Sequence, residues 1–272
     1  ACAPSKLVPK KRPPQMQFDF SGQHILITGG NMGLGAGVAR GLAAAGAKLT
    51  LVGLEPDVPE VAAAWSAEFG RDITGLSCDI ATPQGIALLA GLDVTLDGLI
   101  NNAGLELITP IADPSPDIDA VFRRITEINI IGTFSVTRAL LPKLKDGARI
   151  VNTASMWGKT AVAEFSAYCA SKHAVIGLTR SLARELCGRG ISVNAVCPGW
   201  VRTDASMRSL AAMSQQSGRD ENDLLAEIVG AQALPGLMMP QDMADMYLFL
   251  MSTAARNITG QAFTVDRGEL MQ

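Results

Sequence analysis

Histidine and closely paired cysteines are almost missing from this sequence of 272 residues. Only His24 and His173 are present, which argues against a histidine-based metal centre, and we expect no metal. The five cysteines stand far apart with no CxxC pair, a pattern that suits free thiols better than a disulfide framework. Free thiols persist in a reducing compartment, so we expect a cytoplasmic protein.

Long hydrophobic runs and an excess of charge of one sign are missing as well. No apolar stretch reaches the roughly 20 residues that span a bilayer, so we expect no membrane partner. A net charge of −3 provides no electrostatic footprint for a nucleic acid. The composition, 48% apolar and 18% charged, is typical of a globular domain with a substantial core. The expected partner is a small molecule.

The first 20 residues, ACAPSKLVPKKRPPQMQFDF, differ from the rest in their proline and basic content. They have no apolar periodicity, so we expect a disordered arm over 1–20. A solvated tail is the favoured interpretation of the basic cluster at 10–12, and an address signal or a phosphate contact is the alternative. The arm lacks the long apolar core of a secretory signal.

From residue 21 onward, short apolar runs alternate with helical patterns. This alternation predicts a parallel sheet with helices on both faces, whose strands are buried on both sides. The expected fold is therefore a single α/β domain over 21–272, a Rossmann-type doubly wound parallel sheet of about seven strands. The strands are predicted over 24–28, 48–54, 72–78, 97–104, 148–155, 191–199 and 261–266, and the helices over 33–45, 58–69, 116–141 and 165–187.

A glycine-rich turn, ITGGNMGLGAG, joins the first strand to the first helix. Gly29, Gly33 and Gly35 allow a tight turn and a close approach of a ligand to the backbone. The amides and the dipole at the start of the helix favour a pyrophosphate. No Gly-Lys-Ser/Thr follows, which excludes a Walker-type loop. The turn predicts a dinucleotide site.

The end of the second strand indicates which dinucleotide binds. Glu55 lies in the range where an acidic residue usually meets the ribose of NAD, although an exposed acid at a strand end is the alternative interpretation. No Arg or Lys that would hold a 2′-phosphate stands at Met32 or beside Gly53 and Leu54. We expect NAD(H), and NADP(H) is not excluded.

One of the two tyrosines, Tyr168, stands four residues before Lys172 and thirteen after Ser155. On a helix, residues four apart share a face, so the phenol and the ammonium lie together. A free phenol has a pKa of about 10, and a neighbouring ammonium is expected to lower it. Ser155 follows the fifth strand, at the edge where ligands bind in such sheets. The three residues supply a proton donor or acceptor and an orienting hydroxyl for alcohol–ketone interconversion.

These motifs together resemble the short-chain dehydrogenase/reductase superfamily in its single-domain form. The resemblance covers about 21–268 and rests on TGGNMGLG, CDI, NNAG, the asparagine of EINIIGTF, YCASK and PGWVRT. It implies Tyr168 as general acid/base, Ser155 on the substrate oxygen, Lys172 on the ribose and Asn129 holding a relay water. It also implies homotetramers, with a dimer as the alternative. The cofactor-binding set that it implies, together with the residues above, is Gly29, Asn31, Met32, Gly33, Leu34, Gly35, Gly53, Leu54, Glu55, Asp79, Ile80, Asn102, Ala103, Gly104, Tyr168, Lys172, Pro198, Gly199, Val201 and Thr203.

The sequence departs from the family pattern in three places. NAD-preferring relatives usually carry an aspartate at the position of Gly53, and Arg267 stands where a glycine is common. The stretch from Asp79 to NNAG is short, which suggests a trimmed third crossover. We therefore infer NAD from missing positive charge, and expect an unusual turn at Arg267.

Substrate recognition is expected from three segments: LELITP after Gly104, MWGKTAVAEF after Ser155, and a methionine-rich lid at about 200–240. Its pocket is expected to be largely apolar, with Glu106 and Glu164 as candidate partners of a polyol hydroxyl. A polar sugar or hydroxy acid therefore competes with an apolar cyclic or aromatic substrate. The alternatives to an NAD(H)-dependent secondary alcohol oxidoreductase are a 3-oxoacyl thioester reductase using NADP(H) and a non-catalytic cofactor-binding redox sensor. The candidate pocket residues are Glu106, Met156, Trp157, Trp200 and Met207.

Overall fold

The computed structural model describes residues 18–271. Most of the arm expected over 1–20, residues 1–17, lies outside the described residues. The boundary at residue 20 is wrong, because the side chain of Phe20 is only 1% exposed. The Phe20 amide also donates to the carbonyl of Ala45 at 2.8 Å. The packed domain therefore includes residues before Ser21.

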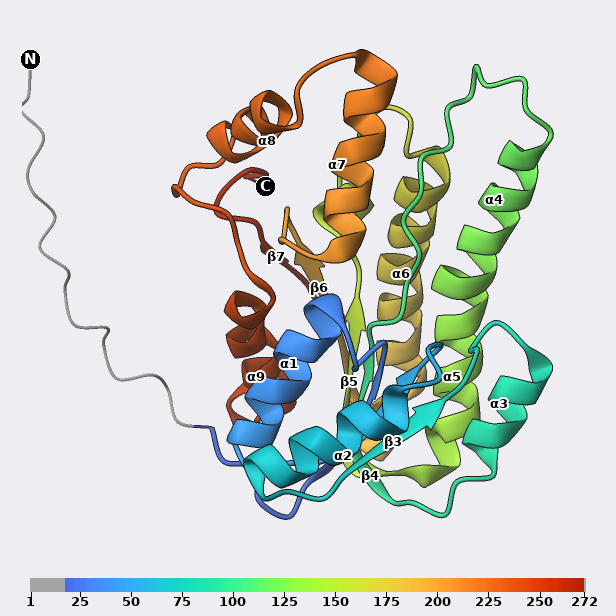
Figure 1. The fold of residues 1–272 in the computed structure, drawn as a ribbon. Coiled ribbons are helices and arrows are strands. Elements are labelled where there is room, and N and C mark those ends of the chain that lie inside the picture. Colours follow the sequence, from blue (N-terminus) through green and yellow to red (C-terminus); the bar gives the residue numbers. More distant parts are fainter. Residues whose placement is uncertain (1–17, 272) are drawn as a thin grey trace, which may run out of the picture.

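Seven parallel strands form one sheet in the order β3-β2-β1-β4-β5-β6-β7 (Figure 1). Every pairing between neighbouring strands is parallel, which confirms the predicted doubly wound sheet. Along β1, Ile25 and Ile27 join one hydrophobic core and Leu26 joins another, so both faces of the sheet are covered. The strands are β1 His24–Thr28, β2 Lys48–Gly53, β3 Ile73–Ser77, β4 Leu96–Asn101, β5 Leu144–Thr153, β6 Ser192–Pro198 and β7 Ala262–Val265.

Helices cover both faces of this sheet. On one face α1 contacts α2 and α9, and on the other α5 contacts α3 while α4 contacts α6. The α-helices are α1 Gly33–Ala44, α2 Val58–Phe69, α3 Pro83–Ala90, α4 Asp117–Thr126, α5 Thr133–Leu140, α6 Ser166–Glu185, α7 Asp204–Ser217, α8 Glu221–Gly230 and α9 Ala244–Met251.

Two helical segments differ from the sequence prediction. The single helix expected over 116–141 is α4 and α5 joined by a π-helical turn, η1 Glu127–Gly132. The short third crossover still contains α3. This helix was not predicted, because its eight residues carry no clear apolar stripe. Thr82 caps α3 by accepting a hydrogen bond from the Gly85 amide at 3.1 Å.

The expected lid contains α7 and α8, which follow β6 and rise above the sheet in Figure 1. Trp200, Leu210 and Leu224 form a small hydrophobic cluster of their own beneath these helices. The end of the chain is joined to this region, because the Leu234 amide donates to the Arg267 carbonyl at 2.9 Å. Arg267 has a φ of 56°, the left-handed conformation that a glycine adopts more easily. The unusual turn expected at Arg267 is present.

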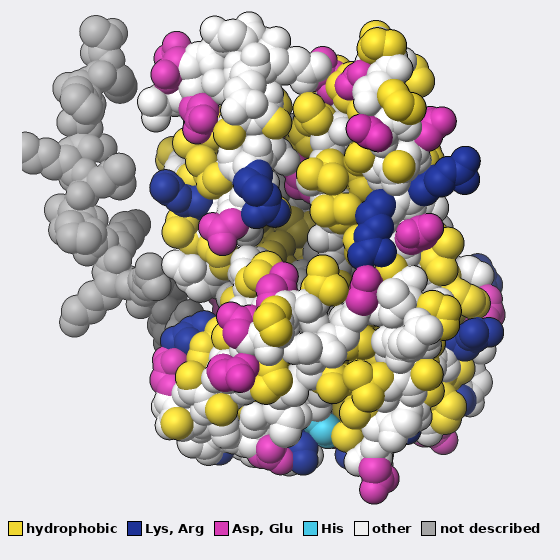
Figure 2. All heavy atoms as spheres, turned by 45° about the vertical axis from the view of Figure 1, so that its right-hand side comes forward, with side chains coloured by type: hydrophobic (Ala, Val, Ile, Leu, Met, Phe, Trp, Pro, Cys, Tyr) yellow, Lys and Arg dark blue, Asp and Glu magenta, His cyan; other side chains and the backbone are white. Residues whose placement is uncertain are grey.

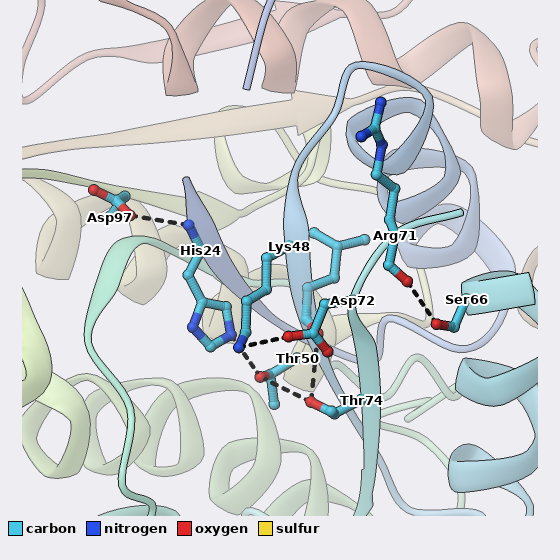
Figure 3. Close-up of polar contacts among 9 residues, drawn as sticks. His24, Lys48, Thr50, Ser66, Arg71, Asp72, Thr74 and Asp97 are labelled. Atoms are coloured by element: carbon cyan, nitrogen blue, oxygen red, sulfur yellow. Dashed lines mark hydrogen bonds and ion pairs between the residues drawn. The ribbon is translucent and has the colours of Figure 1, made fainter. Parts of the chain in front are cut away.

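A polar cluster lies at the opposite ends of the strands, where β1 and β2 begin (Figure 3). The ring Nε2 of buried His24 lies 2.9 Å from Thr50 Oγ1, and Thr50 Oγ1 lies 3.2 Å from Thr74 Oγ1. Lys48 forms an ion pair with Asp72 at 2.6 Å. Since ligands bind at the carboxyl ends of strands in such sheets, we assign this cluster a structural role.

Candidate functional site

A cleft of about 460 Å³ opens at the carboxyl ends of β1, β2, β4, β5 and β6. Figure 2 shows a hollow in one face of the molecule, with hydrophobic side chains inside and charged side chains around its rim. The cleft brings together segments that lie far apart in the sequence. Its predicted lining residues are Gly29, Asn31, Met32, Gly33, Leu34, Gly53, Leu54, Glu55, Asp79, Ile80, Asn102, Ala103, Gly104, Glu106, Ser155, Met156, Trp157, Tyr168, Lys172, Pro198, Gly199, Trp200, Val201 and Thr203.

The glycine turn is packed too tightly for side chains. A Cβ on Gly35 would stand 1.9 Å from the Gly29 carbonyl oxygen, and Gly29 itself has a φ of 61°. Asn102 Nδ2 donates to that same carbonyl at 3.0 Å and fixes the turn against the end of β4. Gly35 therefore lies behind the turn and outside the cleft lining. The cradle in front of it, at the start of α1, fits a dinucleotide pyrophosphate.

Beyond the turn, Glu55 and Asn31 occupy the end of β2. Asn31 Nδ2 donates to Glu55 Oε2 at 3.1 Å. A Cβ on Gly53 would stand 2.3 Å from Asn31 Oδ1, so the aspartate that relatives carry there does not fit beside Asn31. Met32 and Leu54 are 48% and 61% exposed and carry no charge. The carboxylate of Glu55 is thus held against Asn31 of the turn, and it suits a ribose hydroxyl.

Asp79 lies further along the cleft and is held by a residue that sequence reasoning missed. Arg124 Nη2, from α4, pairs with Asp79 Oδ2 at 2.9 Å, and Arg124 itself lines the cleft. The pair and the amide of Ala81 lower the pKa of Asp79 against the opposing effect of burial. No motif singles out Arg124, because the rotation of α4 about its axis decides which of its side chains faces the cleft.

Ser155, Tyr168 and Lys172 all line the cleft. Ser155 follows β5, and Tyr168 and Lys172 share one face of α6. Lys172 Nζ lies 5.5 Å from the centre of the Tyr168 ring and donates to the carbonyl of Thr153 at 2.8 Å. The cleft therefore brings a hydroxyl, a phenol and an ammonium together.

The protonation of this group is dominated by burial. Burial raises the pKa of Tyr168, as does the negative charge of Glu106, while a hydrogen bond with Ser155 lowers it. Burial lowers the pKa of Lys172 to about 8, although Glu106 opposes that shift. The expectation of a lowered phenol pKa is wrong for this structure, because burial is the largest effect and raises the pKa of Tyr168. At neutral pH Tyr168 is protonated.

Asn129 does not line the cleft; it holds one wall in place. Its Oδ1 accepts from the Leu105 amide at 2.8 Å, and its Nδ2 donates to the Leu105 carbonyl and to Ser171 Oγ, both at 2.9 Å. The π-helical turn η1 carries Asn129 and places its amide between the segment after β4 and α6. The side-chain amide is thus committed to protein partners.

The substrate end of the cleft has aromatic walls. The Trp157 ring lies edge-on to Tyr168 with centroids 6.0 Å apart, and edge-on to Trp200 at 6.3 Å. Met207 does not line the cleft, because it packs with Trp200 into the hydrophobic cluster beneath α7 and α8. Glu164 also lies outside, where its Oε1 accepts from exposed Gln216 at 2.8 Å.

Several cleft residues were missed by sequence reasoning. Arg208 comes from α7, and Glu269 comes from the segment after β7. Their placement depends on how the lid and the end of the chain fold over the sheet, and no local pattern in the sequence encodes that. The full set of missed lining residues is Val52, Cys78, Leu105, Arg124, Ile128, Thr153, Ala154, Asp204, Ala205, Ser206, Arg208 and Glu269.

Within residues 18–271 no cluster of His, Cys, Asp and Glu forms a metal site, and no helix is long and apolar enough to span a membrane.

A family model described as enoyl-(acyl carrier protein) reductase matches residues 29–269. Among curated proteins, the chain is 34% identical to 2-(S)-hydroxypropyl-CoM dehydrogenase 3 of Xanthobacter autotrophicus, over 90% of this chain and 95% of the relative. It is 32% identical to D-beta-hydroxybutyrate dehydrogenase of Cupriavidus necator, over 93% of this chain and all of that protein. The chain belongs to the short-chain dehydrogenase/reductase superfamily.

Solved structures agree with this assignment. The crystal structure of L-sorbose reductase from Gluconobacter frateurii, complexed with NADPH and L-sorbose, superimposes with a TM-score of 0.86. It is 26% identical and covers 94% of this chain and 100% of its own. The predicted superfamily is thus confirmed, and with it an NAD(P)-dependent oxidoreductase. These similarities do not identify the substrate of this short-chain dehydrogenase/reductase.

Proposed function

We propose that this enzyme interconverts a secondary alcohol and its ketone with NAD(H), using Tyr168 as the general acid/base. The observation that carries the proposal is the meeting of Tyr168, Ser155 and Lys172 in one cleft with the glycine turn. This combination supplies proton transfer and an oriented oxygen beside a dinucleotide cradle. A complete set of catalytic groups favours an enzyme over a cofactor-binding sensor.

The residues of the cleft fit a nicotinamide dinucleotide. A Cβ on Gly35 would clash with the Gly29 carbonyl oxygen, so the tight turn that would present backbone amides to a pyrophosphate requires glycine there. Glu55 would hold a ribose hydroxyl, and Asp79 would face the adenine. When bound, the nicotinamide supplies or accepts the hydride. NAD is favoured because Met32 and Leu54 offer no cation to a 2′-phosphate, although the similar L-sorbose reductase was crystallised with NADPH.

The protein's own groups handle the oxygen and its proton. In ketone reduction the Ser155 hydroxyl donates a hydrogen bond to the carbonyl oxygen, and the protonated phenol of Tyr168 gives its proton to the forming alkoxide. In alcohol oxidation the phenolate of Tyr168 takes the proton back. The raised pKa of Tyr168 keeps it protonated at neutral pH, so the proton needed for reduction is in place.

The test is reduced-nicotinamide absorbance with NAD or NADP and a panel of secondary alcohols, sugars, hydroxy acids and their ketones, together with an acetoacetyl thioester. Turnover of alcohols or ketones with NAD supports the proposal. Turnover of the thioester alone with NADPH would establish the thioester reductase instead. Tight NADH binding with no turnover of any compound would favour the redox sensor.

We also propose a cytoplasmic homotetramer, with a homodimer as the alternative. The cysteines of residues 18–271 are free, which suits a reducing compartment. Three large apolar side chains on the α4–α5 segment, Phe122, Ile131 and Phe134, are between 41% and 53% exposed and would gain from a partner subunit. Size-exclusion chromatography with light scattering tests this assembly, and a single 28.5 kDa species would contradict it.

A further inference from the structure

Glu106 is placed in the cleft by hydrogen bonds on its neighbour. The segment after β4 carries Gly104, Leu105 and Glu106 past the catalytic group, and Asn129 binds both the amide and the carbonyl of Leu105. A Cβ on Gly104 would stand 3.4 Å from Lys172 Nζ, so the segment runs directly beside the catalytic lysine. Glu106 itself is half-buried and lines the same cleft as Tyr168.

The positive charges of Lys172 and of Arg208 from α7 act on the Glu106 carboxyl group, and both side chains also line the cleft. The hydroxyl of Ser209, a residue that is only 5% exposed, also acts to lower the pKa of Glu106. These partners lower the pKa of Glu106, but burial has the larger effect and raises it. Glu106 thus adds a carboxyl group to the cleft that Lys172, Arg208 and Tyr168 also line.

We propose that Glu106 makes this enzyme select neutral polyhydroxylated alcohols and their ketoses, and reject hydroxy acids. This inference rests on the proposed oxidoreductase function of the same cleft. A substrate hydroxyl can donate a charge-assisted hydrogen bond to the Glu106 carboxylate. A substrate carboxylate in the same half-buried space would meet a like charge, which is repulsive at low local dielectric.

Other groups in the cleft agree with a neutral substrate rich in hydroxyls. Glu269 brings a second carboxylate to the lining, and its buried Oε2 has no hydrogen-bond partner. Trp200 is only 7% exposed, and its indole Nε1 also has no hydrogen-bond partner. Unpaired buried polar atoms are rare, and hydroxyls satisfy both acceptors and donors.

The named relatives do not decide between these substrate classes. One is D-beta-hydroxybutyrate dehydrogenase, whose name specifies an acid, and the solved L-sorbose reductase holds a neutral ketose. The choice for this chain therefore rests on Glu106 and its surroundings.

The experiment compares matched pairs that differ only at one end, such as sorbitol and gluconate or xylitol and xylonate. Binding of each compound to the enzyme–NADH complex is measured by nicotinamide fluorescence, and kcat/KM is measured with NAD. We expect the wild type to favour the polyol of a pair by at least tenfold. Glu106→Gln should reduce that preference at least tenfold, because it removes the negative charge and frees Lys172 and Arg208 for an anion.

Glu164→Gln is the matched control, since it changes a carboxylate that lies outside the cleft. It should leave the preference unchanged. Circular dichroism and NADH binding check that each variant is folded. A wild type that binds gluconate as well as sorbitol, or that binds no polyol of the panel, overturns the inference, as does an unchanged preference in Glu106→Gln. If the wild type neither binds NADH nor turns over any compound, the proposed function itself fails.

Discussion

At the scale of single residues, Tyr168 is the side chain on which the chemistry depends. In the proposed mechanism it carries the proton that joins or leaves the substrate oxygen, and a phenylalanine keeps the ring without the hydroxyl. We expect Tyr168→Phe to lower kcat by about 10²- to 10⁴-fold, the range for loss of a general acid/base. NADH binding, measured by fluorescence, should stay as in the wild type. Unchanged turnover in this variant would refute the mechanism.

The pH dependence of the two reaction directions is also set by single residues. Ketone reduction needs the protonated phenol of Tyr168, whose pKa is raised, and the ammonium of Lys172, whose pKa is lowered to about 8. Reduction should therefore be level at neutral pH and fall as the pH rises above 8. Oxidation needs the phenolate, so it should rise with pH through the neutral range. Profiles of kcat/KM in both directions test this, and a reduction rate that rises above pH 8 would contradict it.

The meeting of Tyr168 and Lys172 in the cleft could be predicted from the sequence, because it depends on spacing within one helix. Tyr168 and Lys172 share a face of α6 wherever that helix packs. The residues that surround them were harder to predict. Arg208 and Glu269 reach the cleft only through the packing of the lid and of the end of the chain. Met207 was misplaced for the same reason, since a one-residue rotation decides whether a side chain of α7 faces the cleft or the cluster beneath it.

At the scale of elements, the glycine turn before α1 is the most constrained part of the site. A Cβ on Gly35 would stand 1.9 Å from the Gly29 carbonyl oxygen, so Gly35→Ala forces the cradle to open. We expect at least a tenfold loss of NADH affinity, checked by fluorescence titration.

Gly177→Ala on α6 is the matched control, because nothing lies within 4 Å of the added Cβ. An alanine on an exposed helix face stabilises by up to about 1 kcal/mol, so this variant should melt no lower than the wild type. Equal loss of NADH affinity in both variants would show that the turn is not the cofactor cradle.

The strands could be predicted well, because strands buried on both faces give continuous apolar runs that end at polar or glycine residues. The π-helical turn at Glu127–Gly132 could not be predicted, since its residues fit an ordinary helical pattern. That turn inserts into the helix between α4 and α5 and directs Asn129 toward Leu105. The relay water expected at Asn129 stays a prediction, and the Asn129 side chain supports the wall that carries Glu106.

At the scale of the whole molecule, the polar cluster opposite the cleft links the stability of the fold to pH through His24. Burial and the charge of Lys48 lower the pKa of His24 below its usual 6.5 in the folded state. The folded protein therefore resists the protonation that the unfolded chain accepts. The stability that neutral His24 allows is complete above about pH 6.5, and it decreases as the pH falls below that value toward the folded pKa.

His24→Gln should remove part of this pH dependence, because glutamine keeps a hydrogen-bonding group near Thr50 and does not titrate. We expect urea denaturation to show a smaller loss of stability between pH 7.5 and pH 5 in the variant than in the wild type. Equal losses in both proteins would mean that other groups cause the acid sensitivity.

The two tyrosines have a spectroscopic consequence. Tyr168 lies in the cleft, Tyr247 lies fully buried with its hydroxyl 2.7 Å from Thr153 Oγ1, and burial raises the pKa of both phenols. The chain has no other tyrosine. The ultraviolet absorbance of ionised phenol should therefore not increase as the solution is made alkaline until the domain unfolds. In Tyr247→Phe any rise of that band with pH would come from Tyr168 alone, so the pH at which it rises would report the ionisation of the proposed acid/base group without any substrate.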